Sequence, residues 1–166
     1  MSEDIKDIIK NFKMTRYEDM PSFELYVDQL ITIAENELKP LSYVYSYQNI
    51  TPSMVNNYVK QKVIDKPVKK KYTRDQLAKL ILVTALKSVF SIGEIGEAIK
   101  YICEKENFGQ MYNKFCDYFE ISLKKLFLEE DFHIDLKDSI YIVTNTISSK
   151  LYLQTTLLKI RGSENE

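Results

Sequence analysis

The segment 50–76 contains two helix-start signals with a basic turn between them. Thr51 followed by Pro52 is typical of a helix N-cap and the first helical position. Thr73, with Gln76 three residues later, has the spacing of a capping box. A chain satisfies two such signals this close together with a short first helix and a tight connection. The segment therefore predicts a helix over 51–61, a basic wing over 66–72 and a second helix from Thr73 to about Phe90.

Helical spacing of apolar residues continues through most of the chain. Only four Gly and four Pro occur among 166 residues, so turns are few and helices are long. Pro21 and Ser22 predict the start of a helix that carries Phe23 on its apolar face and ends at Pro40. The fold class is therefore all-α. Further helices are expected over 3–12, 91–102, 107–128 and 137–160.

A Tyr-rich connector occupies residues 40–49. An irregular loop is favoured here over a short strand. The alternation Tyr43-Tyr45-Tyr47 is compatible with a surface that stacks bases, but packing on neighbouring helices is the preferred interpretation.

The composition argues against several classes of protein. Hydrophobic residues make up 45% of the chain, which supports a core and argues against disorder. No apolar run of about 18 residues is present, and the acidic N-terminus does not have the pattern of a signal peptide. Two cysteines, Cys103 and Cys116, are too few for a disulfide framework and are expected to be reduced core thiols. We therefore expect a cytoplasmic protein that does not contact membranes.

Residue types that carry catalysis or bind metals are sparse. His133 is the only histidine and lies in an acidic loop, without a second His or a Cys pair at ligand spacing. Gly93 and Gly96 fall within a helical pattern rather than a loop that cradles phosphate. One loop histidine does not support a Ser-His-Asp arrangement. We expect no catalytic site, no metal site and no cofactor.

Charge is distributed unevenly along the chain. Residues 55–80 contain eight Lys or Arg and two acids, which gives this segment a charge of +6. The whole chain has a net charge of −1, so the remaining residues sum to −7. Such a basic island creates a local positive field in an acidic protein. It indicates an anion-binding surface beside the helix over 51–61.

The segment 50–95 resembles the DNA-binding headpiece of MerR-like winged helix-turn-helix regulators. Thr51 matches the cap of their recognition helix, and Val55 and Tyr58 match its buried positions. Val63-Ile64 stand where this group has paired Leu residues, and Phe90-Ser91-Ile92-Gly93-Glu94-Ile95 matches the last helix. Two departures are that Asn56 replaces an Arg and Lys62 replaces the Gly of the turn.

A longer stretch, Pro21 to Ala98, looks closer to an uncharacterised family of low-GC Gram-positive bacteria. That family has a MerR-like helix-turn-helix and no assigned function. The resemblance depends on Asn56-Asn57-Tyr58 and on the run Lys69-Lys70-Lys71-Tyr72. It divides the chain into an N-terminal helical arm over 1–20, a winged helix-turn-helix domain over 21–102, and a C-terminal helical region over 103–161.

These resemblances imply a DNA-binding transcriptional regulator whose partner is double-stranded DNA. The helix over 51–61 would enter the major groove, where Asn pairs with adenine and Lys with guanine. The wing over 66–72 would contact phosphates. Such regulators commonly bind paired half-sites, so a homodimer is expected. The predicted DNA-binding residues are Thr51, Ser53, Asn56, Asn57, Lys60, Lys69, Lys70, Lys71 and Arg74.

The sequence leaves two questions open. A non-catalytic protein–protein interaction module that uses the same helix-turn-helix fold is the alternative function. The wing is short and has Lys where the MerR-like group commonly has Arg, and this departure, together with the acidic remainder of the chain, favours the alternative modestly. The C-terminal helices are compatible with dimerisation, with a core that closes over the headpiece, or with a site for a small-molecule or protein effector.

Overall fold

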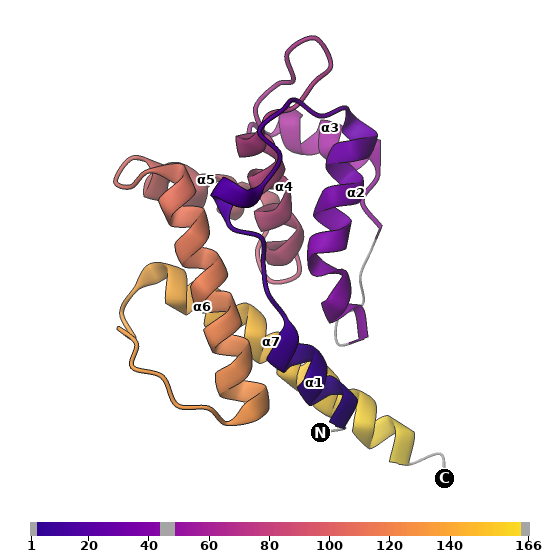
Figure 1. Cartoon of the computed structure of the whole chain (residues 1–166), viewed down its shortest axis with the longest axis vertical. Coiled ribbons are helices and arrows are strands. Elements are labelled where there is room, and N and C mark those ends of the chain that lie inside the picture. The colour runs from indigo at the N-terminus through magenta and orange to yellow at the C-terminus, as the bar shows by residue number, and fades with distance from the viewer. Residues whose placement is uncertain (1–2, 44–48, 164–166) are drawn as a thin grey trace. The chain divides into compact units, whose positions relative to one another are not determined.

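Helices account for the regular structure of the described residues, 3–43 and 49–163, in the computed structural model (Figure 1). Within these residues the only β-structure consists of two isolated antiparallel bridges. The prediction of an all-α fold is therefore confirmed. The helices are α1 (Glu3–Asn11), α2 (Val27–Leu38), α3 (Pro52–Lys60), α4 (Arg74–Leu86), α5 (Ile92–Cys103), α6 (Phe108–Leu128) and α7 (Ser139–Ser163), with short 3-10 helices at Tyr17–Asp19 and Lys39–Tyr43.

The chain forms two compact units. One unit consists of the described residues within Met1–Met14, Pro40–Tyr47 and Phe115–Glu166, and the other of those within Thr15–Lys39 and Gln48–Lys114. The boundary between them falls inside α6. The second unit contains α2 to α5 and is the one that carries the basic island.

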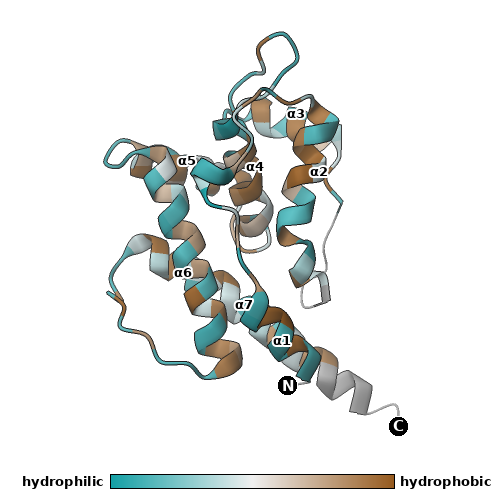
Figure 2. Ribbon diagram, viewed as in Figure 1, coloured by the Kyte–Doolittle hydropathy of each residue, from teal (hydrophilic) through white to brown (hydrophobic). Residues whose placement is uncertain are grey.

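Helix α4 forms the centre of the second unit. Its residues from Gln76 to Leu86 are buried, with Lys79 as the one partly exposed exception. A helix that is apolar on all sides must be covered on all sides. Accordingly α2 and α5 pack against α4, while α3 packs against α2. Figure 2 shows apolar residues along α4, whereas α2 alternates between apolar and polar turns.

Local capping signals set the starts of three helices. The side chain of Thr51 accepts a hydrogen bond from the Met54 amide at the start of α3. A capping box that pairs Thr73 with Gln76 begins α4, and another that pairs Ser91 with Glu94 begins α5. These three starts were predicted from sequence and are confirmed.

The predicted start of α2 is wrong. The helix begins at Val27 rather than near Ser22, because Leu25 is extended and exchanges two backbone hydrogen bonds with Tyr72, each 2.8 Å long. Those bonds use the N–H and C=O groups of Leu25 that a helix would bond internally. Phe23 consequently lies outside the helix and is 63% exposed instead of lining its apolar face.

Aromatic side chains hold the first unit together. Phe12, just after α1, packs edge-on against Phe119 of α6 at 5.9 Å, and Phe127 packs against Tyr152 of α7 at 5.2 Å. The buried Glu120 carboxylate accepts hydrogen bonds from the Met14 amide at 2.9 Å and from Lys13 Nζ at 2.8 Å. These contacts join α1, α6 and α7 around one core.

Two further expectations concern the connector and the cysteines. Tyr45, Tyr47 and the side chain of Tyr43 lie outside the described residues, so the interpretation of this alternation stays a prediction. Cys116 is buried, as expected for a core thiol. Cys103 is exposed, so the expectation of a core thiol is wrong there, because it occupies the last turn of α5.

Replacing the two glycines of α5 separately with alanine will have different effects on stability. Gly93→Ala is expected to raise the free energy of unfolding by about 0.5 kcal/mol, because alanine is the better helix former and the added methyl meets no atom within 4 Å. Gly96→Ala is expected to gain less or to lose stability, because its methyl would lie 3.0 Å from Val63 Cγ2. Urea unfolding of both variants measures the difference, and a gain as large for Gly96→Ala as for Gly93→Ala would contradict the expectation.

Candidate nucleic-acid interface

Helix α3 presents a polar face to solvent. Val55 and Tyr58 are buried on its other side and anchor it to the core of its unit. Residues three, four and seven positions apart share one face of a helix, and the exposed residues have this spacing. These exposed residues are Ser53, Asn56, Asn57 and Lys60. The four predicted contacts therefore lie together, with hydroxyl, amide and ammonium groups available to base edges or phosphates.

The turn that ends α3 contains a strained lysine. The Val63 amide bonds to the carbonyl of Tyr58, and the Lys62 amide bonds to that of Val59, each at 3.0 Å. This pair of bonds is the Schellman motif, whose central residue adopts the left-handed conformation. Lys62 has φ of 60° at that position. Glycine adopts this conformation without steric cost, whereas a residue with a Cβ does not.

The predicted wing is a hairpin with a two-residue tip. Val68 and Lys71 exchange backbone hydrogen bonds of 3.0 and 2.9 Å. The two residues between them, Lys69 and Lys70, have φ of 48° and 64°. Positive φ at both central positions is the requirement of a type I′ turn, which strongly favours Asn-Gly. In Figure 1 the chain between α3 and α4 extends from its unit as a narrow loop.

Three of the four non-glycine residues with positive φ in the described chain are lysines of this one segment. Each left-handed L-residue costs roughly 1–2 kcal/mol relative to an unstrained conformation. Backbone strain of this kind gathers at functional sites, so an observed outlier supports a hypothesis of function. Lys62, Lys69 and Lys70 are therefore positions where a positive charge is present in spite of the backbone preference.

The hairpin lysines differ in their surroundings. Lys69 and Lys70 are exposed, and no ion pair or hydrogen bond joins their ammonium groups to another described residue. Lys71 is half-buried, with Nζ 5.5 Å from the ring centroid of Tyr26 and 3.9 Å from Glu24 Oε2. The tip of the hairpin is therefore better placed than its base to bind an outside anion.

Arg74 has partners within its own unit. Its Nε donates a hydrogen bond to the Pro21 carbonyl at 3.5 Å, and its guanidinium lies 5.3 Å from the ring centroid of Tyr17. The Tyr17 hydroxyl in turn is hydrogen-bonded to the Asp75 carboxylate. Arg74 thus connects the segment before α2 to the start of α4, which leaves its side chain less free than Lys69 to reach phosphate.

The environment of Tyr17 changes its ionisation. Burial, followed by the hydrogen bond to Asp75 and the negative charge of that carboxylate, raises the pKa of the Tyr17 hydroxyl from 10.0 to about 12. Loss of the proton would place two negative charges side by side. The contact with Asp75 therefore depends on the neutral hydroxyl.

Large apolar side chains near the hairpin were missed by the sequence analysis. Phe23, Tyr26 and Val68 are 63%, 56% and 65% exposed. Phe23 was assigned to the apolar face of a helix, and its exposure follows from the pairing of Leu25 with Tyr72. Only the Gly-to-Lys replacement at Lys62 gave a sequence signal for the strained lysines.

The part of the chain that the structure describes holds no group of three or more His, Cys, Asp or Glu residues arranged to bind a metal ion. Among the same residues, no helix combines the length and apolar character that crossing a bilayer requires.

This geometry defines a class of protein: an all-α protein with an exposed polar helix followed by a basic hairpin. A family model described as "Domain of unknown function (DUF1836)" matches residues 15–115, and the chain belongs to this family. No curated protein matches the chain, and no solved structure matches it. The matched residues contain α3, the hairpin, α4 and α5, so the candidate interface lies entirely within the family's domain.

Replacing the tip of the hairpin with its preferred residues will stabilise the protein. The double variant Lys69→Asn/Lys70→Gly should raise the free energy of unfolding by about 1–2 kcal/mol, because Asn and Gly adopt positive φ more easily than lysine. Urea unfolding gives the value. Lys60→Gln/Lys66→Gln removes the same charge where φ is not positive. A similar gain in this control would show that relief of charge repulsion, and not of strain, is the cause.

Tyr17→Phe will change how stability depends on alkaline pH. The unfolded chain releases this proton near pH 10 and the folded chain near pH 12, so the contribution of Tyr17 is complete below pH 10 and is lost as pH rises toward 12. Across this window the variant should lose less stability than the wild type, as measured by urea unfolding at a series of pH values. Tyr26→Phe, which removes an exposed hydroxyl, is the control, and equal losses in wild type and Tyr17→Phe would exclude the assignment.

Proposed function

We propose that this protein is a DNA-binding transcriptional regulator with a MerR-like winged helix-turn-helix. In this proposal α3 is the recognition helix and enters the major groove of double-stranded DNA. The hairpin at 68–71 is the wing and contacts the flanking phosphates. The regulator would act in the cytoplasm.

The observation that carries the proposal is the left-handed backbone of Lys69 and Lys70 at an exposed hairpin tip. Folding alone would favour Asn and Gly there. Two exposed ammonium groups next to each other suit a phosphate backbone, which attracts positive charge without regard to base sequence.

The exposed face of α3 supports the same proposal. Asn56 and Asn57 carry amides that can pair with adenine, and Lys60 can donate to guanine. The helix is only nine residues long and is fixed to its unit by Val55 and Tyr58. The helix is therefore short and anchored, with the uncharged Asn56 and Asn57 at its centre and Lys60 at its end. Such a helix is compatible with base readout.

We further propose that the regulator is a homodimer that pairs through α7. Ile142, Leu153 and Leu157 are 51%, 58% and 46% exposed, and their spacing places them on one side of that helix. An exposed apolar stripe of this kind is typical of an association surface. Two headpieces would then bind two half-sites.

One observation favours the alternative, a non-catalytic module that binds a protein partner. Phe23, Tyr26 and Val68 expose large apolar surface on and beside the hairpin. Exposed aromatic residues are frequent at the centre of protein interfaces. Such a module would not bind duplex DNA at physiological salt.

Fluorescence anisotropy with labelled random and native-promoter duplexes at two salt concentrations tests the proposal. Binding should weaken steeply with salt, and the slope of log K against log salt should become less negative by about 0.9 for each phosphate contact removed. Lys69→Asn/Lys70→Gly should bind DNA more weakly even though it is expected to be the more stable protein. Reversing the charge of Lys69, Lys70 and Lys71 together should abolish binding.

A charge-matched control is Lys6→Gln/Lys10→Gln, which neutralises two exposed lysines of α1. This variant should bind like the wild type. Light scattering of the same complexes should give two chains per duplex. Failure to bind at low salt, or an equal loss in the control, would reject DNA binding through the hairpin, and one chain per duplex would reject the dimer.

A further inference from the structure

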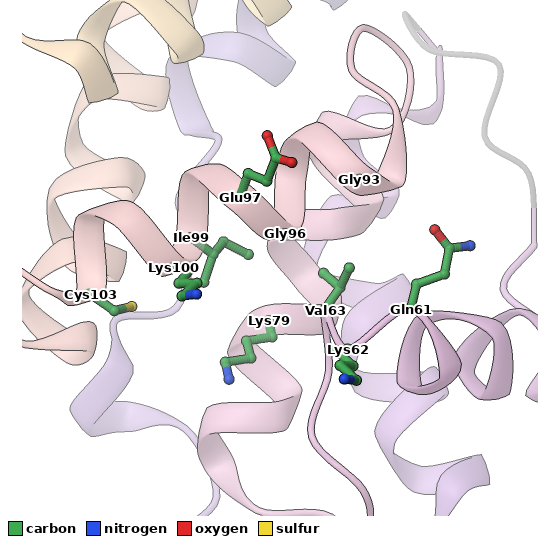
Figure 3. A pocket seen from close by; sticks show the side chains of 10 residues that line it. All are labelled: Gln61, Lys62, Val63, Lys79, Gly93, Gly96, Glu97, Ile99, Lys100 and Cys103. Atoms are coloured by element: carbon green, nitrogen blue, oxygen red, sulfur yellow. The ribbon is translucent and has the colours of Figure 1, made fainter.

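A pocket of about 460 Å³ lies between the turn that ends α3 and the helices α4 and α5. Lys62 and Val63 contribute the turn, and Lys79 reaches in from α4. Residues from Gly93 to Cys103 supply the wall from α5 (Figure 3). The pocket lies wholly within one unit of the chain, and its lining includes none of the exposed α3 residues Ser53, Asn56, Asn57 and Lys60.

Glycines shape the α5 wall of this pocket. Gly96 allows α5 to approach the turn so closely that a Cβ at this position would lie 3.0 Å from Val63 Cγ2. A Cβ at Gly93 would meet no atom within 4 Å, so the wall there is bare backbone facing open space. The pocket is therefore closed at the turn and open along the first turn of α5.

Positive charge predominates in the lining. Lys62, Lys79 and Lys100 supply three ammonium groups, and Glu97 is the one acid among the lining residues. In Figure 3, Glu97 extends from the other side of α5 than the one that faces Lys62 and Lys79. Lys79 Nζ is paired with the exposed carboxylate of Asp65 at 2.6 Å. The ammonium groups of Lys62 and Lys100, by contrast, form no ion pair or hydrogen bond with any described residue.

Lys62 is the most informative of these residues. It keeps its charge at a left-handed position where glycine ends a helix without strain. Its side chain also borders the pocket, so the strained backbone position and the pocket lining share this residue. A lysine ammonium is a compact donor that binds phosphate as a point charge.

We propose that this pocket binds an oxyanion, a phosphate group held by Lys62 and Lys100. The phosphate would belong either to a small phosphorylated molecule or to the DNA backbone beside α3. The volume accommodates a phosphate with an attached organic group. Lys79, already paired with Asp65, contributes to the local field rather than a free donor.

Occupancy of the pocket would affect α3 directly. Lys62 and Val63 form the Schellman turn that fixes the end of this helix. A ligand on Lys62 therefore acts on the element that is proposed to enter the major groove, and this link to regulation rests on the proposed function. The binding of phosphate to the pocket does not depend on the proposed function.

NMR of the full ¹⁵N-labelled chain, titrated with inorganic phosphate at constant ionic strength, tests the site. The chain has four glycines, and two of them, Gly93 and Gly96, line the pocket. Their amide signals should shift saturably. Gly109, which lies against the Tyr17 ring outside the pocket, should not shift. Sodium chloride in place of phosphate should leave all three unchanged.

Matched variants assign the effect to the pocket. Lys100→Gln should weaken phosphate binding by about tenfold, the change expected when one charge-assisted hydrogen bond is lost. Lys105→Gln, which neutralises an exposed lysine near the end of α5 but outside the pocket, should bind like the wild type. No saturable shift of Gly93 and Gly96, or equal binding by Lys100→Gln and wild type, would overturn the proposal.

Adding duplex DNA distinguishes the two sources of phosphate. If DNA shifts Gly93 and Gly96 and competes with inorganic phosphate, the pocket holds a backbone phosphate. If phosphate and DNA bind together, or if DNA does not bind, saturable phosphate binding assigns the pocket to a free small anion. Failure of DNA binding alone would thus reject the proposed function and leave the phosphate site intact.

Discussion

The burial of α4 on all sides is the constraint on which the second unit depends. Its two buried polar side chains have internal partners, since Thr84 donates to the Leu80 carbonyl at 2.8 Å and Gln76 donates to that of Asp65 at 2.7 Å. Gln76 also accepts from the Thr73 amide. One side chain thus caps α4 and anchors the chain just before the hairpin. Covering α4 therefore positions α2, α5 and the base of the hairpin together.

The hairpin is held at its base and strained at its tip. Four backbone hydrogen bonds, two between Leu25 and Tyr72 and two between Val68 and Lys71, are each worth about 1 kcal/mol. Two left-handed lysines cost about 1–2 kcal/mol each. These terms are of similar size, so the hairpin tolerates lysine at its tip because the base is well bonded. The strain is thereby confined to two exposed residues, Lys69 and Lys70.

Local signals were readable in the sequence, whereas contacts between distant residues were not. The caps at Thr51, Thr73 and Ser91 depend on residues within one turn, and each was predicted correctly. The start of α2 depends on Tyr72, far along the chain, and was predicted wrongly. In the candidate site, too, local features were predictable from the sequence and tertiary contacts were not. The exposed face of α3 follows from helical periodicity, but the engagement of Lys71 by Tyr26 and of Arg74 by Tyr17 arises from tertiary packing.

Because its strained cations are lysines rather than arginines, the proposed interface separates phosphate binding from base readout. Lysine binds phosphate as a point charge and lacks the planar fork that reads a guanine edge. Lys62 follows α3 and Lys69 and Lys70 lie on the hairpin beyond it, so these strained cations suit positioning on a backbone. Any discrimination between bases then falls to the exposed face of α3, to Ser53, Asn56, Asn57 and Lys60. Three of these residues, Ser53, Asn56 and Asn57, have short side chains. Such side chains reach a base edge only if α3 lies deep in the groove, and phosphate contacts next to the helix are what would hold it there.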